Sequence, residues 1–160
     1  MNVSEEEKND AATWYNQGIE LAKKSSFDDA LFCFDKALAI TPGDITIINT
    51  KGLALQQIGK FEEAMACYDR VLEIDPQNIT ALNDKGQVCH RLERYREAIA
   101  CYDRSIMIKK DVYETWYNKS LALIKMNRPA TALAMLEKTL ELNPQHRQSI
   151  QLKNILKDNL

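Results

Sequence analysis

The chain has 160 residues and a formal net charge of -2, with 45% hydrophobic and 28% charged residues. This is an ordinary composition for a soluble globular protein, and the length is sufficient for a real core. The near-balance of charge argues against nucleic-acid binding, which needs a basic patch or stripe, and no apolar run is long enough to span a bilayer. The first eight residues are acidic and lack the apolar stretch of a secretory signal, so we expect a cytoplasmic protein.

The sequence repeats itself four times with a period of 34 residues. Large residues recur at Trp14, Ile48, Leu82 and Trp116, small ones at Gly18, Gly52, Gly86 and Ser120, and alanine at Ala30, Ala64, Ala98 and Ala132. Phe34, Tyr68, Tyr102 and Leu136 follow, and Pro42, Pro76 and Pro144 close three of the four units. A fixed period of this size is the signature of stacked structural repeats.

Each unit has the pattern of two helices joined by a short turn. In the second unit Ile48, Leu55 and Ile58 recur at near-helical spacing, Gly59 breaks the pattern, a second apolar stripe follows, and Pro76 ends it. In chain order the predicted helices span about 11–24, 28–40, 45–58, 62–74, 79–92, 96–109, 113–126, 130–142 and 146–158.

The recurring residue types have separate physical reasons. Glycine at the eighth position of a unit removes the β-carbon where the two helices of a hairpin cross, and alanine does the same from the second helix. A mid-helix glycine costs about 1 kcal/mol against alanine, so its recurrence indicates that close approach outweighs this loss. The large residues are predicted to fill the space between hairpins. One hairpin cannot bury its outer face alone, so the units must stack.

These residues resemble the tetratricopeptide repeat, whose pattern falls into place when the units are numbered from Ala11, Ile45, Ile79 and Tyr113. The resemblance implies an all-α fold, a right-handed superhelical solenoid of four helix-turn-helix repeats plus a C-terminal capping helix. It divides the chain into an N-terminal extension (1–10), four repeats (11–44, 45–78, 79–112 and 113–146) and the capping helix (147–160). The capping helix is expected to keep a polar outer side.

The fourth repeat departs most from the family pattern. It has Ser120 for glycine, Leu136 for the aromatic residue and Thr139 for a small residue, while Pro129 stands at the predicted start of its second helix. Lys110 replaces the proline before it, so the turn into this repeat is expected to have a different shape.

Members of this family are mostly scaffolds, so the resemblance implies that the first helices line a concave groove that holds a peptide or protein segment. The groove positions carry many amides and hydroxyls, which can bond the backbone of an extended peptide. The predicted groove residues are Tyr15, Asn16, Ile19, Asn49, Thr50, Leu53, Asn83, Asp84, Gln87, Tyr117, Asn118 and Leu121.

Some co-chaperones of this family hold the C-terminal carboxylate of a heat-shock chaperone with lysine, asparagine and arginine side chains. Neither register of the corresponding positions supplies a cation here, and an acidic terminus would meet Asp84 or Glu114 instead. The sequence therefore predicts a binding groove without a carboxylate clamp.

The sequence predicts no catalytic, cofactor-binding or metal-binding residues. Cys33, Cys67 and Cys101 occupy the same position in successive repeats, 34 residues apart. Equivalent positions of stacked repeats are expected to lie farther apart in space than a disulfide allows, and the CxxC pairs of a zinc site are absent. His90 and His146 belong to different units. We therefore expect a protein without cofactor that is not an enzyme.

Two other functions remain open. The ends or convex faces of the repeats could pair to form a homo-oligomer, which would make the chain an assembly module. The chain could also be a substrate-specific chaperone, like the small secretion chaperones with this repeat. Lysines at the seventh position and aspartates at the twenty-fifth indicate a solvated surface rather than a basic binding stripe.

Overall fold

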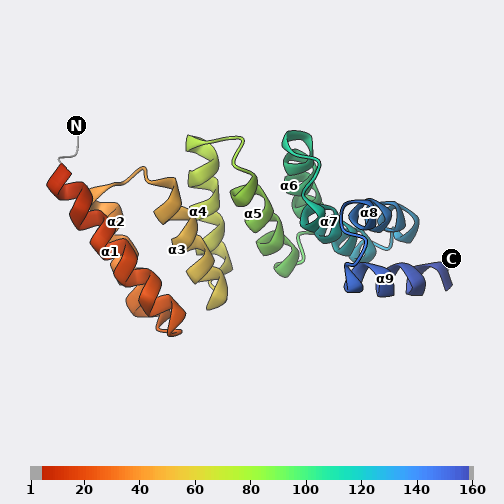
Figure 1. Ribbon diagram of the computed structural model, residues 1–160, viewed down its shortest axis with the longest axis horizontal. Helices are drawn as coiled ribbons and strands as arrows, with labels where there is room; N and C mark the ends of the chain where they lie inside the picture. The colour runs from red at the N-terminus through yellow and green to blue at the C-terminus, as the bar shows by residue number, and fades with distance from the viewer. Residues whose placement is uncertain (1–4, 159–160) are drawn as a thin grey trace. The chain divides into compact units, whose positions relative to one another are not determined.

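The computed structural model describes residues 5–158, and all regular secondary structure in this part of the chain is helical (Figure 1). The helices are α1 (Glu5–Lys23), α2 (Phe27–Ile40), α3 (Ile45–Gln57), α4 (Phe61–Ile74), α5 (Ile79–Arg91), α6 (Tyr95–Ile108), α7 (Tyr113–Lys125), α8 (Pro129–Leu142) and α9 (Arg147–Asp158). Their bounds agree with the predicted ranges except at α1, which begins before residue 11. Residues 5–10 are all polar, so an apolar stripe could not reveal this helical turn. Residues 1–4 of the predicted extension and 159–160 of the predicted capping helix lie outside the described residues.

The chain divides into two compact units, Met1–Pro76 and Gln77–Leu160. In the first unit α1 packs on α2, α2 on α3, and α3 on α4. In the second unit each helix from α5 to α9 packs on the next, and the first helices α5 and α7 also contact each other. Each unit therefore consists of stacked helical hairpins with a core between successive helices.

A residue with left-handed backbone conformation closes the first helix of every hairpin. These residues are Ser25, Gly59, Glu93 and Asn127, with φ of 62°, 78°, 59° and 55°. In the second repeat the N–H of Lys60 then bonds the carbonyl of Leu55 at 2.9 Å, the long bond of a Schellman motif. Only one of the four residues is a glycine, so the turn is fixed by the hairpin packing as much as by local preference.

In the first three hairpins the glycine lies where the two helices cross, as predicted, but it faces an aromatic ring that was expected between hairpins. A β-carbon built at Gly18 would lie 2.6 Å from the Phe34 ring, one at Gly52 2.8 Å from Tyr68, and one at Gly86 2.5 Å from Tyr102. All three aromatic residues are at most 1% exposed. The glycine therefore makes room for an aromatic ring that passes under the first helix.

The large residues at the fourth position of each repeat are buried in only two repeats. Ile48 and Leu82 are 1% and 0% exposed, whereas Trp14 and Trp116 are half-buried. The indole N–H of Trp116 donates to the carbonyl of Lys110 at 2.8 Å. The prediction that all four fill the space between hairpins is wrong for the tryptophans, because a large ring with a polar N–H is seldom fully buried.

The first helix of the fourth repeat lacks the side-chain cap found before α3 and α5. Asp44 and Asn78 accept backbone N–H groups of the first turns of α3 and α5, but Val112 at the same place before α7 has no acceptor. The repeat itself is well packed. Pro129 opens α8 as predicted, and Leu136 is fully buried.

Lysines of the first helices form ion pairs with acids on the second helix of the preceding repeat. Lys51 Nζ lies 2.6 Å from Asp35, and Lys119 pairs with Asp103 in the same way. The acidic partners are about half exposed, so each pair contributes little stability. The repeating charges thus connect neighbouring hairpins within each unit.

Helix α9 continues the register of a first helix. Lys153 pairs with Glu137 at 3.1 Å, and Ser149 is fully buried at a position that is also buried in α3, α5 and α7. Ile150 and Ile155 are 40% and 56% exposed. The expectation of a polar outer side is therefore wrong in part, because α9 packs on α8 and no other described helix covers its far side.

Candidate functional site

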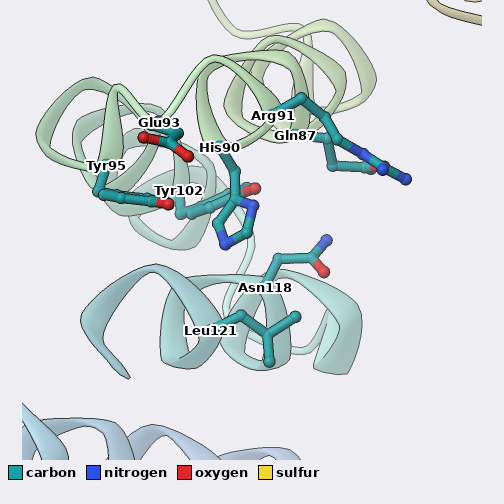
Figure 2. A pocket seen from close by; sticks show the side chains of 8 residues that line it. All are labelled: Gln87, His90, Arg91, Glu93, Tyr95, Tyr102, Asn118 and Leu121. Atoms are coloured by element: carbon teal, nitrogen blue, oxygen red, sulfur yellow. The ribbon is translucent and has the colours of Figure 1, made fainter. Parts of the chain in front are cut away.

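Two adjoining pockets lie on the second unit, where α5 and α7 face each other. We call the first the tyrosine pocket; it has a volume of about 370 Å³ and is lined by Gln87, His90, Arg91, Glu93, Tyr95, Tyr102, Asn118 and Leu121 (Figure 2). We call the second the acidic pocket; it has a volume of about 500 Å³ and is lined by Ile79, Thr80, Asn83, Asp84, Gln87, Lys109, Val112, Glu114 and Asn118.

Gln87 and Asn118 line both pockets, so two amide side chains stand between them. Gln87 lies on α5 and Asn118 on α7, and both are partly exposed. An amide can donate and accept hydrogen bonds at once, which suits the alternating N–H and C=O groups of an extended backbone. The arrangement therefore offers one backbone-binding strip with a pocket on either side.

Tyr102 forms the inner wall of the tyrosine pocket. It reaches this place from α6 because Gly86 leaves space beneath α5 for the ring. The residue is 1% exposed. Burial raises the pKa of Tyr102, and the charges of Cys101, Cys89 and Asp84 act in the same direction, so the hydroxyl keeps its proton at neutral pH.

His90 extends from α5 toward Asn118 and Leu121 on α7 (Figure 2). Its Nε2 atom is buried and has no hydrogen-bond partner among the described residues. The ring meets Tyr95 edge-on, with centroids 5.2 Å apart. Burial lowers the pKa of His90, and the positive charges of Lys125 and Arg91 lower it further, so the imidazole is neutral at pH 7.

The acidic pocket has charges of both signs at its edge. Asp84 and Glu114 come from α5 and α7, and Lys109 comes from the turn after α6. A hydrogen bond of 3.0 Å from the Thr115 hydroxyl to Asn83 Oδ1 holds α7 against α5. This bond fixes the distance between the two walls of the pocket.

The first unit has a pocket of its own beside Tyr15. It has a volume of about 370 Å³ and is lined by Ala11, Ala12, Tyr15, Thr41, Asp44, Thr46 and Ile47. The Tyr15 hydroxyl and the Thr50 hydroxyl are hydrogen-bonded at 3.3 Å, and Thr50 donates to the carbonyl of Thr46 at 2.8 Å. The hydroxyl groups of Tyr15 and Thr50 are therefore already bonded to each other.

The described residues contain no group of three or more histidine, cysteine or acidic side chains that could hold a metal ion. Cys33, Cys67, Cys89 and Cys101 are free thiols. Among the described helices, none is both long and apolar enough to cross a membrane.

A family model described as "Anaphase-promoting complex, cyclosome, subunit 3" matches residues 23–105, just over half of the chain. The tetratricopeptide repeat model matches residues 113–146. The chain belongs to the tetratricopeptide repeat family. No curated protein matches its sequence.

Solved structures of other tetratricopeptide repeat proteins share the fold. MamA (residue 41 to the end) from Desulfovibrio magneticus RS-1 is 18% identical with a TM-score of 0.88, over 99% of this chain and 87% of that one. YrrB is 21% identical with a TM-score of 0.78, over 97% and 80%. The first tetratricopeptide repeat domain of Spaghetti (RPAP3) is 18% identical with a TM-score of 0.70, over 72% and 91%. These likenesses confirm the predicted class, an all-α helical-repeat solenoid.

The tetratricopeptide register placed five predicted groove residues of the second unit at its pockets: Asn83, Asp84, Gln87, Asn118 and Leu121. Tyr117 lines neither pocket and instead meets His146 edge-on at 4.7 Å. In the first unit only Tyr15 lines the pocket described above, with Thr50 bonded to it. Asn16, Ile19, Asn49 and Leu53 line none of these pockets.

Sequence reasoning missed Arg91, Glu93, Tyr95, Tyr102 and Lys109. Tyr102 was assigned to the core because it follows the tetratricopeptide pattern, and it is indeed buried. The available signal was the pairing of a tyrosine at the twenty-fourth position with a polar residue at the twelfth, as in Tyr102 with His90. The other four lie at helix ends and turns, where the repeat pattern specifies little.

Proposed function

We propose that this protein is a scaffold or adaptor that holds an extended peptide segment of a partner across α5 and α7. The proposal rests on one observation above all, the two amides shared by adjoining pockets. A bound backbone would lie along Gln87 and Asn118, with one side chain in the tyrosine pocket and another in the acidic pocket.

Two relatives support binding of a peptide. The RPAP3 domain was solved bound to an HSP90 peptide, SRMEEVD, and YrrB is described as having an unusual peptide-binding site. Cytoplasmic location remains a prediction from the sequence.

We infer that the groove lacks a carboxylate clamp. The lining of the acidic pocket includes the carboxylates of Asp84 and Glu114 and one lysine, Lys109, so it would repel an acidic terminus. Lys109 also has Asp111 at 3.9 Å. We therefore expect the SRMEEVD peptide not to bind. Micromolar binding in titration calorimetry would contradict the inference.

Selection from a phage-displayed library of random peptides tests the groove itself. Peptides that bind the full chain are synthesised, and their Kd is measured by titration calorimetry on the wild type, Gln87→Ala and Asn118→Ala. Each substitution removes side-chain hydrogen bonds to the backbone, so we expect binding to weaken about 2- to 10-fold.

Gln151→Ala serves as the matched control, because Gln151 is an exposed amide on α9. It should leave Kd unchanged. The proposal fails if the library gives no binding peptide, or if the peptides bind both groove variants as tightly as the wild type.

Self-assembly is a second candidate function, favoured by Phe32. This residue is 56% exposed on α2, whereas the equivalent positions of the other repeats carry alanine at 66, 100 and 134. A large apolar side chain exposed at one repeat alone indicates a contact surface that the repeat packing does not need.

A further inference from the structure

The tyrosine pocket contains a buried polar atom that the described residues leave without a hydrogen bond. His90 Nε2 is buried and has no hydrogen-bond partner among the described residues, and Tyr102 is almost completely buried. Both residues line the same pocket. A buried polar atom without a partner destabilises a protein, so its presence in the wall of a cavity indicates that a ligand group bonds it there.

The second repeat shows how the same two positions look when they are satisfied. Tyr68 and Gln56 are equivalent in the repeat to Tyr102 and His90, and the Tyr68 hydroxyl donates to Gln56 Oε1 at 3.1 Å. Both tyrosines pass beneath a glycine of the first helix in the same way. The third repeat thus keeps the tyrosine and replaces its internal acceptor with a histidine, which opens the pair to a ligand.

We propose that the tyrosine pocket is a recognition subsite for a carboxamide side chain, glutamine or asparagine, on the segment bound by the groove. Its carbonyl oxygen and its NH₂ group would bond the Tyr102 hydroxyl and His90 Nε2. This assignment rests on the proposed function, because the carboxamide belongs to a bound peptide. A carboxamide both donates and accepts, so it fits either tautomer of a neutral histidine.

The charges around the pocket favour a neutral group. Lys125 and Arg91 act on His90, so a ligand cation would be repelled there. Asp84 acts on Tyr102 and Glu93 lines the pocket, so a carboxylate would be repelled on that side. The cavity of about 370 Å³ is at the small end of ligand pockets and suits one side chain.

The peptides selected on the full chain test the subsite. We expect one position to be enriched in glutamine or asparagine. Replacing that residue with glutamate or lysine should weaken binding to the wild type about 10-fold or more, because a charge would be buried without a partner. Tyr102→Phe should weaken binding of the carboxamide peptide about 2- to 10-fold, but hardly change binding of a peptide with leucine at that position.

Tyr68→Phe is the matched control, since it removes the same atom from the equivalent tyrosine and should leave both peptides unaffected. The subsite is refuted if no position prefers a carboxamide, or if Tyr102→Phe weakens both peptides equally. These outcomes differ from failure of the groove, which would appear as binding that is independent of Gln87 and Asn118.

Discussion

The contact between Gly86 and Tyr102 connects the packing of a hairpin to the chemistry of its surface. A β-carbon at Gly86 would lie 2.5–3.0 Å from three atoms of the tyrosine ring. In the fourth repeat the same pair of positions holds Ser120 and Leu136, both fully buried. A side chain at the eighth position is therefore tolerated where the ring is absent.

This pairing predicts a non-additive effect on stability. Gly86→Ser should lower the free energy of unfolding by about 1–3 kcal/mol through overpacking, more than the small gain in helix propensity. Combined with Tyr102→Leu, the serine should cost less, with a coupling energy of about 1 kcal/mol. Urea unfolding of the wild type, the two single variants and the double variant measures this coupling. Additive effects would contradict the crossing.

His90 should make stability depend on pH. Its folded-state pKa lies below the usual value of about 6.5, so the unfolded chain binds the proton more readily. The stabilising effect of the neutral ring is therefore complete above about pH 6.5 and is lost as the pH falls toward the lowered pKa. The melting temperature of the wild type should drop in this range more steeply than that of His90→Gln, which carries the residue found at position 56. Parallel pH profiles would exclude the effect.

The repeat period predicted single residues well where packing repeats and poorly where it does not. Ala30, Ala64, Ala98 and Ala132 are all fully buried, as their recurrence requires. The pattern did not predict that the tryptophans are half-buried or that Tyr102 lines a pocket. Burial and hydrogen bonding depend on neighbours that a single-sequence pattern does not specify. Whether a polar atom has a partner is a property of three-dimensional packing.

At the scale of single helices, the beginning of α7 is the place where the sequence omits a stabilising group. Asp44 and Asn78 cap α3 and α5, and Val112 occupies the same position before α7 with an extended backbone that a cap residue also adopts. A side-chain cap contributes about 0.5–2 kcal/mol. The helix therefore starts with backbone N–H groups that an added acceptor could bond.

Val112→Asn should raise the free energy of unfolding by about 0.5–1 kcal/mol, because the asparagine oxygen can accept an N–H of the first turn of α7. Asn78→Ala, which removes the existing cap of α5, should lower it by a similar amount. Chemical denaturation measures both. A loss of stability in Val112→Asn would show that the apolar contacts of Val112 outweigh a cap.

The positions of the helices could be predicted from the sequence because the apolar residues and the turn residues recur with the same period. The first turn of α1 was missed since its residues are uniformly polar, and the exposed face of α9 was missed since a first-helix pattern looks the same with or without a covering helix. Element type and order are thus encoded locally, whereas the covering of a face depends on which helices are neighbours.

At the scale of the whole molecule, Phe32 is the residue on which the hypothesis of self-assembly rests. The ring is 56% exposed, meets Trp14 edge-on at 6.2 Å, and has the ammonium of Lys36 5.2 Å from its centre. These contacts hold the ring at the surface of the first hairpin. Because the ring is already held in place, it would lose little conformational entropy on binding a partner, and its exposed apolar area favours such a contact.

If this surface joins copies of the chain, the average mass in light scattering should rise with protein concentration, and Phe32→Ala should shift that rise to higher concentration. The substitution copies the alanine of the other three repeats at an exposed position, so the fold should change by no more than about 0.5 kcal/mol. Met107→Ala is the control, since Met107 is 80% exposed on α6 and lies in a different repeat from Phe32. Equal masses for the wild type and Phe32→Ala at every concentration would contradict assembly through Phe32 and leave peptide binding as the proposed function.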